Sequence, residues 1–332
     1  MKKPNPYYDP AKYHHKPYGF RNPPGSPGGR RFTVELAREA AHFMGELIRA
    51  VHDPYPFDSE HVMSEAEALE GWRSQTTTDQ VLWLGHASFL IRLGEQLILT
   101  DPYLSPYASP VPHKATKRIV PSAIAEEHLP QVDVIVISHN HYDHLDTVSL
   151  KKLAKTQPQA TVVVPLGVKV LLKGLFDNVV ELDWFDVTNP NQGKLSIRAL
   201  PAVHTSKRGI GDTNRSLWCG FAIGDGRKQV YFAGDTAYGE VFKEIGEKAG
   251  PFDLGLVPIG AYQPRVLMRP VHATPEEAVL IGEDIKAARL IGMHWGTIRL
   301  TTEPMLEPKH RFLKAPGSIP RETLRIGETV AF

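Results

Sequence analysis

The stretch from Val132 to Ser138 is predominantly apolar, which is typical of a strand that is buried on both faces. The segment His139-Asn140-His141-Tyr142-Asp143-His144 follows it directly. Three histidines and an aspartate therefore stand at the end of a strand, where a loop can direct them towards one point. Imidazole nitrogens and carboxylate oxygens suit Zn²⁺, and also Mn²⁺ or Fe. The sequence therefore predicts a metal site at the edge of a sheet.

The spacing within this segment allows two ions to be bound. Alternate residues of an extended stretch share a face, so His139 and His141 can bind one ion. After a turn, Asp143 and His144 can reach a second ion. Histidines also cluster by chance in polar loops, but the position directly after a buried strand makes that explanation the weaker one.

Polar residues also follow three other apolar runs, each where the run ends. A histidine in such a position is more often a hydrogen-bonded loop residue than a metal ligand. The recurrence at four strand ends nevertheless favours a bimetal centre, and a carboxylate among these residues could bridge two ions. The residues are His204 after Leu195 to Ala202, Asp235 after Val230 to Gly234, and His294 after Leu290 to Met293.

The rest of the pattern places helix-like stretches among short strand-like runs, which indicates a layered α/β protein with a mixed sheet. Helices are expected at 147–156, 239–249 and 275–287, the last with Thr274 as its N-cap and Pro275 in its first turn. Strands are expected at 81–84, 88–93, 96–100, 132–138, 161–164, 178–182, 195–202, 216–223, 229–233, 254–257 and 290–293.

The first part of the chain differs from the rest. Residues 1–32 are rich in Pro, Gly, Tyr and Arg, which predicts an extended arm. From Thr33 to about Val51, apolar residues recur at helical spacing. Packing of this amphipathic helix on the main domain is the simpler explanation, and an interfacial membrane helix is the alternative. We therefore expect an arm and helix over residues 1–75 and one catalytic domain over residues 76–332.

Composition narrows the function classes. The 332 residues carry a formal net charge of +1, so no overall field favours binding to nucleic acid. The single cysteine, Cys219, excludes an intrachain disulfide and a thiolate zinc cluster. The first residues do not form a secretory signal, and no apolar run approaches the roughly 18 to 20 residues of a membrane span. A cytoplasmic protein is expected, and its oligomeric state stays open.

The ordered set His-x-His-x-Asp-His, then distant His, Asp and His at strand ends, resembles the metallo-β-lactamase superfamily. This resemblance implies a four-layer αββα sandwich with two Zn²⁺ ions at one edge of the sheets. By motif position it assigns His139, His141 and His204 to the first metal, Asp143, His144 and His294 to the second, and Asp235 as the bridging ligand.

A narrower resemblance covers about residues 80 to 310. The motifs in this range are similar to those of N-acyl-phosphatidylethanolamine-hydrolysing phospholipase D and its bacterial relatives. This similarity implies a zinc-dependent phosphodiesterase of lipid metabolism. The expected substrate is a phospholipid, the expected nucleophile a metal-bridging hydroxide, and the protein could contact the inner face of a membrane peripherally. The motifs are Leu84-Gly85-His86-Ala87-Ser88, Leu99-Thr100-Asp101-Pro102, Phe232-Ala233-Gly234-Asp235-Thr236, Pro258-Ile259-Gly260-Ala261-Tyr262, Pro275-Glu276-Glu277-Ala278 and His294-Trp295-Gly296-Thr297.

Two residues are expected to take part in catalysis. One is Asp143, and the other is His272, which matches a histidine just before Pro-Glu-Glu-Ala in that family. His272 would protonate the leaving group or orient the phosphate, although a surface histidine before a helix is an equal alternative. The mammalian enzyme has a polar residue where this chain has Val271, and this departure leaves the identity of the substrate open.

Several further residues have expected supporting roles. His86 is expected to hold a loop by a hydrogen bond, and Asp101 either orients a metal-bound histidine or only forms a turn. Arg265 is a candidate phosphate contact. Lys117 and Arg118 either contact an anionic head group or, more simply, are solvated loop charges.

Two other functions remain open. The same metal centre could attack a carbonyl carbon, as in the lactonases and thioesterases of the superfamily. A metal-binding scaffold without catalysis is the alternative from another class, and the complete set of ligands disfavours it.

Overall fold

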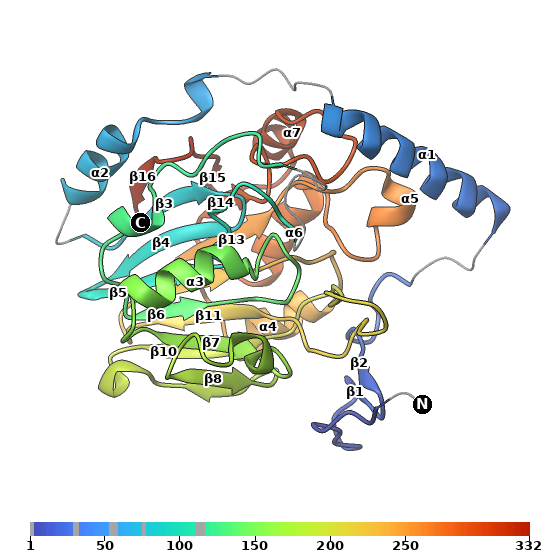
Figure 1. The fold of residues 1–332 in the computed structure, drawn as a ribbon, viewed down its shortest axis with the longest axis horizontal. Helices are drawn as coiled ribbons and strands as arrows, with labels where there is room; N and C mark the ends of the chain where they lie inside the picture. The colour runs from blue at the N-terminus through green and yellow to red at the C-terminus, as the bar shows by residue number, and fades with distance from the viewer. Residues whose placement is uncertain (1–2, 29–32, 53–58, 75–77, 110–116) are drawn as a thin grey trace.

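In the part of the chain that the structure describes, two mixed β-sheets of seven strands each lie face to face at the centre of the molecule (Figure 1). The computed structural model describes residues 3–28, 33–52, 59–74, 78–109 and 117–332. In spatial order, the first sheet contains β16 (Thr329–Ala331), β3 (Gln80–Gly85), β4 (Ser88–Leu93), β5 (Gln96–Thr100), β6 (Val134–Val136), β7 (Thr161–Pro165) and β8 (Val179–Leu182). The second contains β15 (Arg321–Glu322), β14 (Leu290–Met293), β13 (Leu254–Pro258), β12 (Gln229–Phe232), β11 (Gly220–Gly224), β10 (Ser196–Leu200) and β9 (Val187–Thr188).

Each sheet has a parallel half. Strands β5 to β8 run parallel in the first sheet, and strands β12 to β15 run parallel in the second. All residues are buried in β6, β7, β13 and β14, and so are those of β12 apart from its first, Gln229. This is expected for strands covered on both faces. The carboxyl ends of parallel strands meet at one edge, so residues just beyond β6, β12 and β14 are brought to the same side of the sandwich.

Helices form the two outer layers. Helix α3 (Thr147–Thr156) covers the first sheet and buries Leu150 and Leu153, and Asp146 caps it by accepting from the Val148 N–H. Helices α4 (Val241–Lys248), α6 (Pro275–Asp284) and α7 (Glu307–Lys314) lie over the second sheet (Figure 1). The predicted four-layer αββα sandwich is confirmed. Single-turn 3₁₀ helices occupy Ser59–His61, Glu126–His128, Lys169–Leu172 and Asn191–Gly193.

The first part of the chain runs along the outside of the sandwich. The arm contains a small hairpin, β1 (His15–Lys16) and β2 (Gly19–Phe20). Helix α1 (Val34–His52) follows and lies beside α5 (Arg265–Met268) (Figure 1). Helix α2 (Glu65–Arg73) then buries Ala68 and Trp72. The predicted boundary between residues 75 and 76 falls within 75–77, which lie outside the described residues.

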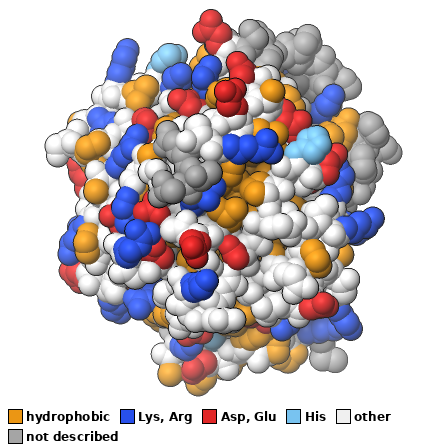
Figure 2. Space-filling view, turned by 90° about the vertical axis from the view of Figure 1, so that its left-hand side faces the viewer, with side chains coloured by type: hydrophobic (Ala, Val, Ile, Leu, Met, Phe, Trp, Pro, Cys, Tyr) orange, Lys and Arg blue, Asp and Glu red, His pale blue; other side chains and the backbone are white. Residues whose placement is uncertain are grey.

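Surface charge is mixed on the face that Figure 2 presents, where lysine and arginine side chains are interspersed with aspartate and glutamate. Within the part of the chain that the structure describes, no helix combines the length and the apolar character that a membrane crossing requires.

Candidate metal centre

Seven side chains from both sheets meet at the edge formed by the strand ends. The segment after β6 supplies four of them, and the loops after β10, β12 and β14 supply the others. Five are at most 4% exposed: His139, His144, His204, Asp235 and His294. Asp143 is 9% exposed and His141 is half-buried. The structure therefore brings together all seven residues that the sequence marked as candidate ligands.

Gly234 allows the two sheets to approach each other at this edge. Its φ is +58°, and a Cβ placed on it would lie 2.5 Å from the Cβ of Ser138. A side chain at this position would push the end of β12 away from the segment after β6. The glycine before Asp235 is thus a requirement for assembling the cluster from two sheets.

The first group of side chains contains His139, His141 and His204. Nδ1 of His141 lies 2.8 Å from Nε2 of His139 and 3.2 Å from Nε2 of His204. Nδ1 of His204 donates to the carbonyl of Val271 at 2.8 Å. Because a neutral imidazole has a single N–H, Nε2 of His204 faces the group as a lone pair.

The same reasoning applies to His139. Its Nδ1 lies 2.9 Å from Oγ of Ser138, and that hydroxyl donates its own proton to Asp101 at 2.5 Å. Ser138 therefore accepts from Nδ1 of His139, which leaves Nε2 as a lone pair. An N–H at Nδ1 of His141 can satisfy one of these two lone pairs, whereas a cation bound among the three nitrogens satisfies both. The first group has the donor set of a metal site.

The second group contains His144, His294, Asp143 and Asp235. Nδ1 of His144 donates to Asp101 at 2.6 Å, so in the neutral ring Nε2 faces the carboxylates of Asp235 at 3.2 Å and Asp143 at 3.4 Å. Nε2 of His294 lies 3.1 Å from Asp235 and 3.6 Å from Asp143. Neither Nε2 has a hydrogen-bond partner among the described residues. These buried, unsatisfied atoms fit a bound cation.

Asp235 lies between the two groups. Its Oδ2 is 3.2 Å from Nε2 of His144, 3.7 Å from Nε2 of His204 and 4.0 Å from Nε2 of His139. A carboxylate in this position is suited to bridging two ions, which is the role that the resemblance implies for it.

The two groups differ in their titration. Burial holds the pKa of His139 and of His204 well below the ordinary histidine value. Burial acts the same way on His144 and His294, but the charges of Asp235 and Asp143 outweigh it. They raise the pKa of His144 well above its usual range and that of His294 to about 9.

The two carboxylates respond in the opposite sense. Burial alone would raise the pKa of Asp143 and of Asp235. The neighbouring His144 and His294 outweigh it and hold both pKa values well below the ordinary value. The second group is therefore strongly negative once its histidines lose their protons, which favours a divalent cation.

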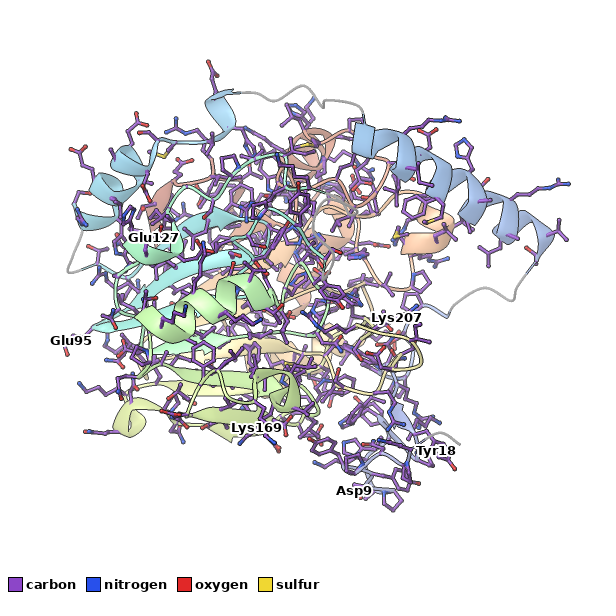
Figure 3. The ribbon with its side chains drawn as sticks, in the orientation of Figure 1. Asp9, Tyr18, Glu95, Glu127, Lys169 and Lys207 are labelled. Atoms are coloured by element: carbon purple, nitrogen blue, oxygen red, sulfur yellow. The ribbon has the colours of Figure 1, made fainter. Side chains whose placement is uncertain are left out.

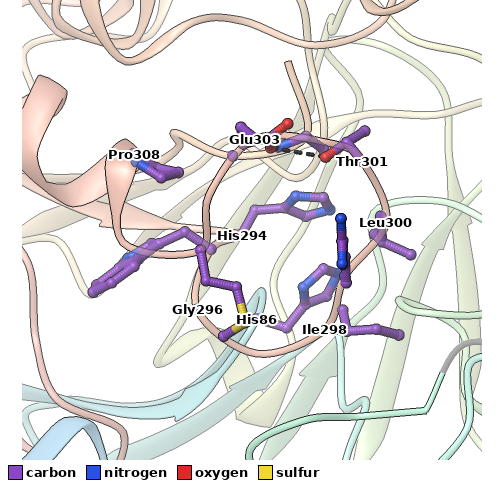
Figure 4. A pocket seen from close by; sticks show the side chains of 13 residues that line it. His86, His294, Gly296, Ile298, Leu300, Thr301, Glu303 and Pro308 are labelled. Atoms are coloured by element: carbon purple, nitrogen blue, oxygen red, sulfur yellow. Dashed lines mark hydrogen bonds between the residues drawn. The ribbon is translucent and has the colours of Figure 1, made fainter. Parts of the chain in front are cut away.

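Supporting residues fix the ligands. Asp101 is fully buried and accepts from His144 and from the backbone N–H of Ser138. Nε2 of His86 lies 2.9 Å from Oδ2 of Asp143, and the backbone carbonyl of His86 accepts from the N–H of His294. The rings of His86 and His294 lie 4.0 Å apart beside a small pocket (Figure 4).

His272 lies over both groups. Its ring centroid is 5.2 Å from that of His204 and 5.4 Å from that of His294. Its Nδ1 is buried without a hydrogen-bond partner among the described residues. Burial lowers its pKa to about 4, so the ring is neutral at physiological pH. The alternative of a surface histidine is not what the structure shows.

Two of the arginines have structural contacts. Arg265 binds the carboxylate of Glu277 and donates to the carbonyl of His272, so it positions the His272 segment. Arg118 is buried and donates to the carbonyls of Leu84, Tyr103 and Val120, so the interpretation as a solvated charge is wrong. No spacing in the sequence distinguishes such an arginine from a surface one.

Comparisons with known proteins agree with this geometry. The family model described as a Beta-lactamase superfamily domain matches residues 96–295. The chain is 41% identical to N-acyl-phosphatidylethanolamine-hydrolyzing phospholipase D 1 of Caenorhabditis elegans, over 69% of this chain and 67% of that protein. It is 37% identical to the mitochondrial enzyme of that name from Saccharomyces cerevisiae, over 76% of this chain and 54% of that protein.

A solved structure shows the same fold. Igni18, a metallo hydrolase from the archaeon Ignicoccus hospitalis, superposes with a TM-score of 0.56 at 23% identity, over 77% of this chain and 99% of that chain. The curated relatives are longer, and the chain spans about two thirds of the worm protein and about half of the yeast protein. The family match, the fold and the histidine–aspartate clusters lead to one conclusion: the chain belongs to the β-lactamase superfamily and is a metal-dependent hydrolase.

Proposed function

We propose that the chain is a two-zinc phosphodiesterase of the phospholipase D type that acts on N-acyl-phosphatidylethanolamine-like lipids. The position of Asp235 between two groups of metal-ligating side chains is the observation that carries the two-metal part. The substrate class is supported by the identity to the worm and yeast proteins, whose names state that activity.

Two divalent ions held at these groups would supply an activated water at neutral pH and neutralise charge on phosphoryl oxygens. The nitrogen and carboxylate donors suit Zn²⁺. The chain itself contributes ligand orientation: Asp101 and Ser138 fix the rings of His144 and His139, and the carbonyl of Val271 fixes the ring of His204. Oriented ligands hold the ions in one arrangement before substrate arrives.

His272 is assigned to orient the phosphate. A ring whose pKa is lowered to about 4 carries one N–H at neutral pH and holds no extra proton to give away. It therefore acts as a neutral hydrogen-bond donor to a phosphoryl oxygen rather than as a charged acid. The closeness of its ring to those of His204 and His294 supports this role, because a phosphodiester held at both groups would lie near it.

The exposed apolar side chains of helix α1 support the proposal that the substrate is a lipid. None of its described side chains is fully buried, and Met44 and Ile48 are 54% and 61% exposed. The helix lies beside α5, which leads into the segment that carries His272. We propose that this apolar surface contacts a membrane next to the active site. In sedimentation with phosphatidylethanolamine vesicles, Met44→Ser with Ile48→Ser should reduce the bound fraction, and Val170→Ser, exposed elsewhere, should not.

Product analysis in H₂¹⁸O tests the reaction. Attack on phosphorus places the label in the phosphatidic acid product and leaves the released N-acylethanolamine unlabelled. Label in the alcohol would mean attack on carbon and would remove the proposal. Lactone and thioester substrates, assayed alongside, would reveal a carbonyl-directed enzyme if they alone were turned over. Metal content, measured on the same sample by elemental analysis, should be two zinc ions per chain.

A further inference from the structure

The N-terminal arm is anchored at the end of β8. Asp183 follows that strand, and its side chain is 3% exposed. Its carboxylate contacts Nζ of Lys12 at 2.6 Å, Nε2 of His14 at 2.6 Å and Nε2 of His15 at 2.9 Å. Three contacts, one from a lysine and two from histidines, thus hold the hairpin of the arm against the first sheet. Figure 3 shows this part of the arm, with Asp9 and Tyr18, on the same side of the molecule as Lys207.

A second set of contacts joins the arm to the loop of residues 204–216, which begins with His204 and precedes β11. The N–H of Phe20 donates to the carbonyl of Asn214 at 2.8 Å. Gly19 has a φ of +151°, and a Cβ placed on it would lie 2.2 Å from that carbonyl oxygen. Only glycine permits this approach. The arm is therefore fitted closely to the loop that carries a candidate ligand.

Asn22 makes the most direct contact. Its Oδ1 accepts from the backbone N–H of His204 at 2.9 Å and from Nε1 of Trp218 at 3.0 Å. His204 is 1% exposed, so its N–H has little access to water that could replace this acceptor. The ring of His204 is fixed separately, by donation from Nδ1 to Val271. Asn22 thus holds the backbone of His204, and Val271 holds its imidazole.

We infer that Asn22 is a positioning residue for His204, so that the N-terminal arm completes the first position of the metal centre. This inference rests on the proposed role of His204 as a metal ligand. His139 and His141 share one segment after β6, whereas His204 comes from the other sheet and lies in a loop without regular secondary structure. The alignment of His204 with those two side chains therefore depends on contacts from outside its loop, and Asn22 provides the one at its backbone.

Metal affinity tests the inference on the full chain. Asn22→Ala removes the acceptor, Asn22→Asp keeps an oxygen in its place, and Gly19→Ala lifts the arm from Asn214. Ser26→Ala is the matched control, because its hydroxyl binds only Pro23 within the arm. Dissociation constants for both zinc equivalents would be measured by chelator competition. Co²⁺ absorption spectra of each variant would report on the geometry of the histidine-rich position, and thermal melting would show that each variant is folded.

Asn22→Ala and Gly19→Ala should weaken one metal equivalent by about ten- to a hundred-fold, the usual effect of removing a group that orients a ligand, and leave the other unchanged. Asn22→Asp and Ser26→Ala should bind both as the wild type does. Wild-type affinity at both positions in a folded Asn22→Ala protein would overturn the inference alone. If Asn22→Ala fails to fold, the Asn22→Asp protein decides. A folded Asn22→Asp protein that loses about ten- to a hundred-fold in affinity for one metal equivalent would overturn the inference. A wild-type protein that binds fewer than two ions would overturn the proposed function as well.

Discussion

Asp101 accepts a hydrogen bond of 2.6 Å from Nδ1 of His144, and both side chains are fully buried. The same carboxylate also accepts from the backbone N–H and the hydroxyl of Ser138, so one buried aspartate orients a candidate ligand from each of the two groups. This contact decides between the two predicted roles of Asp101, because a turn residue alone would not reach His144.

Asp101→Asn should therefore weaken zinc binding. The amide oxygen can replace either Oδ2, which accepts from His144 and the Ser138 hydroxyl, or Oδ1, which accepts from the Ser138 N–H, but in each orientation its NH₂ group opposes a donor. We expect a loss of about ten- to a hundred-fold in affinity, measured by competition with a chelating dye. Asp253→Asn, at the opposite end of β13, is the control and should bind zinc normally. Unchanged affinity in Asp101→Asn would contradict the orienting role.

Loading of the two metal positions should differ in proton release. The pKa of His294 is raised to about 9 and that of His144 is well above its usual range, so both rings carry a proton at neutral pH in the metal-free protein. His139 and His204 are uncharged there, because their pKa values are well below the ordinary one. A cation entering the second group must displace protons, and its affinity should fall as the pH drops below about 9.

Calorimetric titration in two buffers of different ionisation enthalpy measures this difference. The observed heat should depend on the buffer for one zinc equivalent and be nearly independent of it for the other at pH 7. Equal proton release for the two equivalents would show that the two groups do not differ in charge as the structure indicates.

Replacement of His272 should reduce turnover without removing metal. The loss of a hydrogen-bond donor aimed at charge that develops during reaction typically costs about a hundredfold or more in kcat. His272→Ala should show that loss with two zinc ions still bound, and His272→Gln should recover part of it by restoring an N–H donor. His310→Ala, on the exposed surface, serves as the control. A His272→Ala enzyme with normal kcat would exclude the residue from the mechanism.

Asp183→Asn should destabilise the arm and alter the response to acid. Burial raises the pKa of Asp183, but hydrogen bonds with His14 and Lys12 outweigh it and lower that pKa below its ordinary value of 3.8. A lowered pKa in the folded state contributes stability above about pH 3.8 that is lost as the pH falls further. The substitution should therefore cost about 2 kcal/mol in free energy of unfolding at pH 7.

Urea unfolding at pH 7 and at about pH 3 tests this expectation. The difference between wild type and Asp183→Asn should shrink at the lower pH, because the unfolded wild-type chain then takes up a proton at Asp183 that the folded protein, with its lowered pKa, binds much less readily. Limited proteolysis should also cut the arm of the variant faster. Asp9→Asn, in the same arm, should resemble the wild type in both assays. A difference between wild type and variant that does not change with pH would contradict the assignment.

Much of the sandwich could be predicted from the sequence because its strands are short, apolar and followed by polar residues. The ranges of β4, β5, β14 and α3 agree with those expected. Helix α2 was not predicted, although Ser64 and Glu67 form a capping box that signals a helix start. Strands β15 and β16 were also missed. They are edge strands of two and three half-buried residues, too short for a period of two to show.

The candidate ligands of the site could be predicted from the sequence, but not all of the residues that orient them. The seven candidate ligands stand at strand ends, where the sequence pattern marks them, and the structure brings them together. Asp101, which orients His144, also follows a strand and was predicted for that role, but Asn22 does not share such a position. Asn22 precedes His204 by 182 residues, and only the path of the arm places them in contact. Local pattern can mark a residue that binds an ion, but it has no means of pairing that residue with a distant hydrogen-bond acceptor.

The division of ligands between the two sheets has a consequence for folding. A bound ion would link the two sheets, because its candidate ligands come from both and meet only when both sheets are folded and packed together. Such binding adds to the free energy of unfolding, by about 2.7 kcal/mol when free metal exceeds its dissociation constant a hundredfold. The stability of the folded chain would then depend on the concentration of free metal, so that a shortage of metal would lower the amount of folded protein as well as its activity.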